Sequence, residues 1–159
     1  MNTIIPAIIA KDQQELNYYL KKLKNVSDWL HLDIVDGKFA QNNSLDFPFR
    51  LSKNFHYSAH LMVKKPEQWI LKLHSKVDLL IPQFEELTHP HHLICYLKKH
   101  KKKIAFALKP ETKVSALKHF VKDADYILIL TVHPGFYGSK YLPAQLKKIQ
   151  QLIYMILIL

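Results

Sequence analysis

Two histidines and an aspartate occupy alternate positions in two apolar segments of the chain. His31 and Asp33 lie two residues apart in the first segment, and His60 and Met62 do so in the second. If both segments are strands, side chains two residues apart share a face. Two imidazoles and a carboxylate on neighbouring strands form a three-ligand set for a divalent metal, with an open position for a substrate. The alternative is a hydrogen-bonded histidine pair inside a core, although a buried carboxylate is too costly to keep for packing alone.

A second candidate for chemistry is the segment 131–138, which reads Thr-Val-His-Pro-Gly-Phe-Tyr-Gly. It contains Gly135 and Gly138, two of the three glycines in the chain. Glycine allows the backbone to approach a ligand closely or to act as a hinge. The segment is therefore a candidate loop over a binding site, and the alternative is an ordinary turn between a strand and a helix.

The formal net charge is +10, and almost all of the positive charge comes from lysine, since Arg50 is the only arginine. Lysine lacks the planar fork that favours bidentate recognition of bases and phosphates. The lysine cluster at 98–103 contains no arginine or aromatic residue. We therefore interpret it as a solvated loop rather than a nucleic-acid site. The overall charge is compatible with non-specific binding of nucleic acid or with attraction of phosphorylated metabolites, and composition alone does not decide between them.

Short apolar runs alternate with amphipathic stretches along the whole chain. The runs are Thr3–Ile9, Trp29–Val35, Tyr57–Val63, Asp78–Phe84, Lys103–Leu108 and Tyr126–Val132. Helical spacing is found in Gln13–Lys24, Glu67–His74, His92–His100 and Lys113–Val121, and again after Tyr141. This alternation predicts βα units with a parallel sheet. No glycine follows the first run, which disfavours a dinucleotide-binding sheet and favours an α/β TIM (β/α)8-type barrel with about six βα units present.

Composition limits the class of protein. With 159 residues, of which 48% are hydrophobic, the chain is expected to form one domain over residues 1–159 and not to be disordered. Cys95 is the only cysteine, which excludes a disulfide framework and a cysteine-based zinc site and predicts a cytoplasmic location. The longest apolar run, Leu152–Leu159, falls short of the roughly 20 residues that span a bilayer, so we expect no membrane association.

Four segments together resemble the ribulose-phosphate 3-epimerase family. They are His-Leu-Asp-Ile-Val-Asp-Gly-Lys-Phe (31–39), His-Leu-Met-Val with Lys-Pro-Glu (60–67), Ala-Leu-Lys-Pro-Glu-Thr (107–112) and Leu-Thr-Val-His-Pro-Gly-Phe-Tyr-Gly (130–138). The resemblance implies a TIM barrel that interconverts ribulose 5-phosphate and xylulose 5-phosphate in the pentose phosphate pathway. It also implies a divalent metal, with zinc or iron favoured over manganese or cobalt.

The resemblance assigns roles to individual residues. His31, Asp33 and His60 would be metal ligands, and Asp33 would also be one of two carboxylates that move the proton at C3. The metal would polarise the ketone and stabilise the enediolate, which Met62 would cap. The substrate would be contacted by His60 and Met62 and by the closing loop of Gly135, Phe136, Tyr137 and Gly138. The family's usual residues differ at Ala7, Val35, Gln83 and Tyr137.

Barrels of this class have eight units, whereas six are found here. The second catalytic aspartate, the fourth metal ligand and the phosphate-binding glycine loops of the family belong to strands seven and eight, and residues 1–159 do not contain them. We therefore expect a domain that is incomplete at its C-terminus, with little epimerase turnover on its own. Uncovered apolar surface and unpaired strand edges also predict a homo-oligomer.

Two other functions are compatible with parts of this pattern. One is a related phosphosugar barrel, such as a hexulose-phosphate synthase or a relative of orotidine-phosphate decarboxylase, but the Asp-x-Lys-x-x-Asp pattern of those sites is absent. The other is an inactive, basic remnant that binds nucleic acid or a protein partner through open sheet edges.

Overall fold

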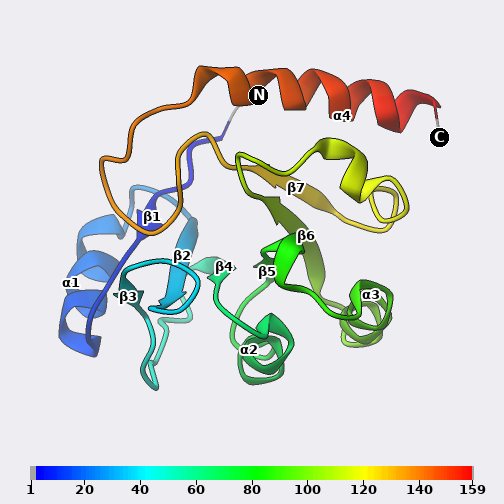
Figure 1. Cartoon of the computed structure of the whole chain (residues 1–159). Helices are drawn as coiled ribbons and strands as arrows, with labels where there is room; N and C mark the ends of the chain where they lie inside the picture. The colour runs from blue at the N-terminus through cyan, green and yellow to red at the C-terminus, as the bar shows by residue number, and fades with distance from the viewer. Residues whose placement is uncertain (1–2, 159) are drawn as a thin grey trace.

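Six parallel strands form an open, curved sheet in the computed structural model of this protein, which describes residues 3–158 (Figure 1). Their order in the sheet is their order in the chain, as in a barrel, and each pairs in parallel with the next. The strands are β1 (Ala7–Ile8), β2 (Trp29–Asp36), β4 (His56–Met62), β5 (Leu79–Pro82), β6 (Lys103–Leu108) and β7 (Tyr126–Ile129). A short strand, β3 (Asn43–Ser44), pairs antiparallel with β2. The predicted α/β architecture, a partial TIM barrel, is confirmed.

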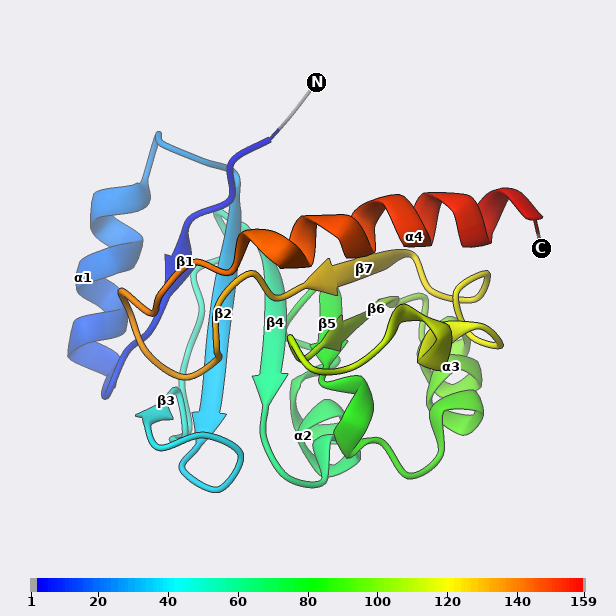
Figure 2. The same cartoon turned by 45° about the horizontal axis from the view of Figure 1, so that its top comes forward.

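Helices cover the convex side of this sheet. They are α1 (Gln13–Leu23), α2 (Pro66–Leu73), α3 (Pro90–Lys99) and α4 (Leu146–Ile158), the last of which lies beside β7 (Figure 2). The α1 helix begins after Asp12, whose carboxylate accepts a hydrogen bond from the Glu15 N–H at 2.8 Å. Pro66 and Pro90 occupy first-turn positions, where the fixed φ angle of proline suits a helix. Within residues 3–158, none of the helices has the length and apolar character needed to cross a membrane.

Period-two alternation divides the apolar side chains into two layers. The larger layer lies between the sheet and the helices and includes the fully buried Leu32 and Ile34 of β2. The smaller layer lies on the concave side and contains Leu79, Ile81, Ala105 and Ala107, with Trp29 and Leu128 packed against it. His31 and Asp33 alternate with Leu32 and Ile34, so they share the concave side, where a barrel has its interior.

Two predicted elements differ most from the structure. The helix predicted over Lys113–Val121 is wrong, because this segment forms a 3₁₀ turn at Val114–Leu117 followed by further turns. No side chain caps this segment at Lys113, and the turns bury Val114, Leu117 and Val121 without an α-helix. The strand predicted over Thr3–Ile9 is reduced to β1.

The end of the chain forms a helix, as expected. The apolar spacing after Tyr141 predicts a helix that continues into the tail, and α4 extends to Ile158. Leu159 lies outside the described residues.

Candidate metal centre

The structure brings His31, Asp33 and His60 together at one point of the concave face. Asp33 on β2 lies in register with His60 on β4, so the two side chains leave the sheet side by side. The Oδ1 atom of Asp33 is 3.1 Å from Nδ1 of His60 and 3.4 Å from Nε2 of His31. Among the described residues this is the one group of three or more potential ligands, with its ligand atoms all within 4.8 Å of one another.

The protonation states of two of these groups suit metal ligands. Burial alone would raise the pKa of Asp33, but hydrogen bonds from His31 and His60 outweigh it and hold the pKa well below its usual range. Asp33 is therefore ionised. Burial lowers the pKa of His60 below its ordinary value despite the bond to Asp33, so this imidazole is neutral near pH 7. A carboxylate and a neutral imidazole are the forms that bind divalent metals.

The surroundings of His31 provide a test of whether a cation fits. Nδ1 of His31 is 2.9 Å from Oγ of Ser58, and the Ser58 hydroxyl donates to the Leu30 carbonyl oxygen at 3.4 Å. Oγ can accept a proton on Nδ1 of His31, and in that tautomer the lone pair of the ring is on Nε2, the nitrogen that faces the Asp33 carboxylate. Two electron-rich groups that face each other in this way fit a cation between them, with Ser58 as the outer partner that orients the ring.

A cavity of about 290 Å³ opens in front of this group. It is lined by Ala7 and Met62 from the strands and by Gly135, Phe136 and Tyr137 from the loop after β7. Met62 and these three loop residues are therefore placed beside the candidate ligands, while Gly138 does not line the cavity. Among the described residues that do line it, Asp33 is the only carboxylate.

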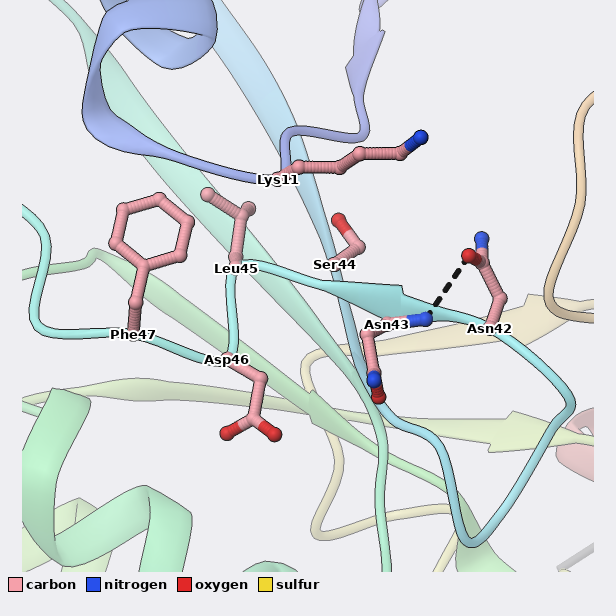
Figure 3. A pocket seen from close by; sticks show the side chains of 7 residues that line it. All are labelled: Lys11, Asn42, Asn43, Ser44, Leu45, Asp46 and Phe47. Atoms are coloured by element: carbon pink, nitrogen blue, oxygen red, sulfur yellow. Dashed lines mark hydrogen bonds between the residues drawn. The ribbon is translucent and has the colours of Figure 1, made fainter.

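The loop over the cavity is fastened at two points. One is Asn42, which lines a neighbouring cavity of about 450 Å³ (Figure 3). The Oδ1 atom of Asn42 accepts a hydrogen bond from the Asn43 N–H at 2.9 Å. The Nδ2 group of Asn42 donates to the Gly135 carbonyl at 2.6 Å. The φ angle of Gly135 is +117°, and an added Cβ would lie 2.8 Å from the Cβ of Ala40. The backbone at position 135 therefore requires glycine.

The second point is the Tyr137 hydroxyl, which accepts a hydrogen bond from the Ile9 N–H at 2.9 Å. Ile9 follows β1, which ends the described sheet, so Tyr137 satisfies a backbone group at the sheet edge. We expect Tyr137→Phe to speed hydrogen exchange of the Ile9 amide by up to about tenfold, since a neutral hydrogen bond contributes about 0.5–1.5 kcal/mol. Amide exchange measured by NMR tests this, with the exposed Tyr141→Phe as the control. Equal exchange rates in both variants would show that the bond does not hold the loop.

Asp36, at the end of β2, fixes the loops next to the site. Its Oδ1 accepts the N–H groups of Lys38 and Phe39, each at 2.9 Å, and its Oδ2 accepts the Lys64 N–H at 2.7 Å. Partial burial acts to raise the pKa of Asp36, but the bonds from these three amides outweigh it and lower the pKa below its usual value. The carboxylate thus joins the loop after β2 to the loop after β4.

We expect Asp36→Asn to lower the free energy of unfolding at pH 7 by about 1–2 kcal/mol. The loss is no larger because the Asp36 carboxylate is partly exposed and water screens its charge. Because the folded-state pKa is lowered, this stabilisation is present above the unfolded pKa of about 3.9 and is lost as the pH falls through the folded pKa. Urea unfolding at several pH values tests both statements, with Asp46→Asn at an exposed position as the control. A difference between wild type and Asp36→Asn that persists undiminished at pH 2 would contradict this account.

The sequence does not predict the hydrogen bonds that three residues make around the site. The bonds of Asp36 and Asn42 depend on backbone groups of other loops, and Gln83 contacts His60 across two strands. The aspartate before Gly37 is the one local signal, since aspartate often bonds nearby backbone amides in turns. Asn42 gives no such signal, and Gln83 is marked only as a position where the family's usual residue differs.

Comparison with known proteins agrees with this geometry. The model of the ribulose-phosphate 3-epimerase family matches residues 3–157. A ribulose-phosphate 3-epimerase of Treponema pallidum is 30% identical, over 96% of this chain and 73% of that protein. Those of Bacillus subtilis and Schizosaccharomyces pombe are 29% and 33% identical, over 95% and 92% of this chain and 72% and 68% of theirs. The chain therefore belongs to the ribulose-phosphate 3-epimerase family.

Proposed function

We propose that this chain acts at C3 of ribulose 5-phosphate, the carbon whose inversion gives xylulose 5-phosphate, with Asp33 as the group that takes up the C3 proton. A divalent metal would be held by His31, Asp33 and His60. The observation that carries this proposal is the convergence of an ionised carboxylate and two imidazoles from β2 and β4 in one cavity. Family membership supplies the substrate class.

The chemistry follows from the charge and position of Asp33. When bound, a divalent metal acts as a Lewis acid that polarises the ketone and so makes the adjacent C3–H bond more acidic. Asp33 removes the C3 proton, and the electron pair of the C–H bond moves toward C2 to give an enediolate. Return of the proton by Asp33 restores the original configuration. Inversion needs a donor on the opposite face, and no other carboxylate lines the cavity among the described residues.

The remaining contacts to substrate are proposed from their positions. Met62 lies beside His60 in the cavity and is 3% exposed, so its thioether can cover the planar intermediate. Gly135, Phe136 and Tyr137 would cover the substrate from the loop side, and Gly138 would serve as a hinge of that loop, with a φ of +72°. The nitrogen-rich donor set favours zinc or iron over the hard cations magnesium and calcium.

Deuterium incorporation tests this proposal. The metal-loaded chain in D₂O is expected to exchange the C3 proton of ribulose 5-phosphate, as followed by proton NMR. Treatment with a chelator should stop the exchange, and zinc or ferrous iron should restore it. If the chain produces no exchange above the protein-free rate with zinc, iron, manganese or cobalt, the proposal is wrong.

Apolar side chains on α4 lead us to propose that the chain self-associates. Ile153 and Leu157 are 55% and 78% exposed, and β1 and β7 end the described sheet. Exposed apolar patches and strand edges promote association. We expect light scattering to give a mass above that of a monomer, and the double variant Ile153→Lys/Leu157→Lys to reduce it. Leu71→Lys, at an exposed position on α2, is the control, and a monodisperse wild-type monomer would contradict the prediction.

Two further expectations are part of the proposal. We propose that residues 1–159 act as one domain, since one cluster of buried apolar residues includes side chains from Ile8 to Leu152. We also propose a cytoplasmic location, as the single cysteine favours a reducing compartment. Fractionation of the source cells tests the latter.

A further inference from the structure

Gln83 lies directly behind His60, on the side away from Asp33. It follows β5, is fully buried, and its backbone N–H donates to the Leu61 carbonyl at 3.4 Å. Its Nε2 is 2.8 Å from Nε2 of His60. Its Oε1 is buried and has no hydrogen-bond partner. The side chain thus contacts His60 with one end of its amide and leaves the other end unsatisfied.

This contact determines which nitrogen of His60 carries the proton. With the Gln83 amide N–H donating to Nε2 of His60, the ring proton is on Nδ1, which donates to Asp33 Oδ1 at 3.1 Å. A metal ligand needs a lone pair on the coordinating nitrogen, and Nδ1 is the nitrogen that faces Asp33 and His31. In this arrangement His60 is hydrogen-bonded to Asp33 but is not ready to bind a metal.

A half-turn of the Gln83 amide reverses this arrangement. The rotation exchanges the nitrogen and oxygen positions, so that Oε1 accepts a proton on Nε2 of His60. The lone pair of Nδ1 is then directed at the space beside Asp33. Oε1, which has no partner in the present orientation, then accepts from His60, while the amide nitrogen moves to the buried position that Oε1 leaves. Histidines that bind metals generally donate their other N–H group to an oxygen of this kind.

We propose that Gln83 is a positioning residue that sets the tautomer of His60, as a donor to the ring without metal and as an acceptor when metal is bound. Glutamine suits both states because its amide offers a donor and an acceptor at the same point. An apolar side chain offers neither, and a carboxylate offers only the acceptor. This inference rests on the proposed function, since it assumes that His60 binds metal.

Cobalt titration followed by visible absorption tests the proposal in four proteins. Gln83→Met keeps the length of the side chain and removes both functions, so we expect the Kd for Co²⁺ to rise by about 10–100-fold. Gln83→Glu keeps the acceptor, so we expect a Kd within about threefold of wild type, or tighter. Gln145→Met removes another glutamine whose Oε1 is buried and unpartnered, away from the site, and is expected to bind like wild type.

The tautomer of His60 in the wild-type chain provides a measurement that does not depend on any variant. Imidazole nitrogen NMR is expected to show the proton on Nδ1 without metal and on Nε2 with Zn²⁺ bound. This measurement and Gln83→Glu decide the question if Gln83→Met does not fold.

The outcomes separate this inference from the proposed function. If the wild-type chain binds no Co²⁺, both fail. If it binds Co²⁺ but Gln83→Met binds equally well, the role of Gln83 is wrong and the metal site stands. The same holds if Gln83→Met and Gln83→Glu weaken binding equally, or if the His60 proton stays on Nδ1 in the zinc-loaded chain.

Discussion

Replacing His31 or His60 with alanine is expected to weaken binding of Co²⁺ or Zn²⁺ by more than about 100-fold. Removal of an outer partner of a ligand typically costs 10–100-fold in affinity, and removal of the ligand itself costs more. His60 is only 3% exposed, so water does not readily replace its imidazole. Isothermal titration of the metal-free chain with each metal measures the effect.

His56→Ala is the matched control for these variants. His56 lies on β4, as His60 does, and its Nδ1 is in hydrogen-bond contact with Oδ2 of Asp78 at 3.3 Å. Its ring stacks on Trp29 with centroids 5.1 Å apart, so its replacement removes a histidine and a local contact without touching the candidate ligands. Metal affinity that falls equally in His56→Ala and His60→Ala would indicate general destabilisation and would contradict a specific site.

Replacing Asp33 with asparagine is expected to slow deuterium incorporation at C3 of ribulose 5-phosphate by about 10²–10⁴-fold, the usual contribution of a general base. Asparagine has the same shape and keeps an oxygen toward His31 and His60, but it cannot take up a proton. The rate of C3 exchange by NMR, at saturating metal, measures the loss. Asp46→Asn serves as the control, and an exchange rate in Asp33→Asn close to wild type would mean that another group removes the proton.

The same experiment separates proton exchange from inversion. Because Asp33 is the only carboxylate among the described residues that line the cavity, the 159-residue chain is expected to exchange the C3 proton faster than it forms xylulose 5-phosphate. Equal rates of exchange and inversion, at an ordinary enzymatic turnover of roughly 1–10³ s⁻¹, would contradict this prediction.

The sequence predicts the position of the candidate ligands well, because two simple rules determine it. Side chains two residues apart share a strand face, and neighbouring parallel strands place Asp33 opposite His60. The same reasoning predicts β6 with its observed ends, Lys103–Leu108. These features depend on local periodicity and on the order of the strands.

Other features depend on contacts between residues far apart in the chain, which local periodicity and strand order do not predict. Asn42 reaches Gly135 across 93 positions of the chain, and Gln83 reaches His60 across 23. The spacing of Val114, Leu117 and Val121 is helical, yet turns bury all three side chains, so periodicity alone gives the wrong element. The functional detail of the site therefore lies in tertiary contacts.

The central claim is that His31, Asp33 and His60 hold a divalent metal next to the substrate cavity. A crystal of the cobalt-loaded chain, measured at the cobalt absorption edge, tests this claim most directly. We expect one strong anomalous peak within coordination distance of His31 Nε2, His60 Nδ1 and Asp33 Oδ1. A peak elsewhere, for example at His74 and His100, whose rings lie 5.0 Å apart, with none at these three atoms, would contradict the account.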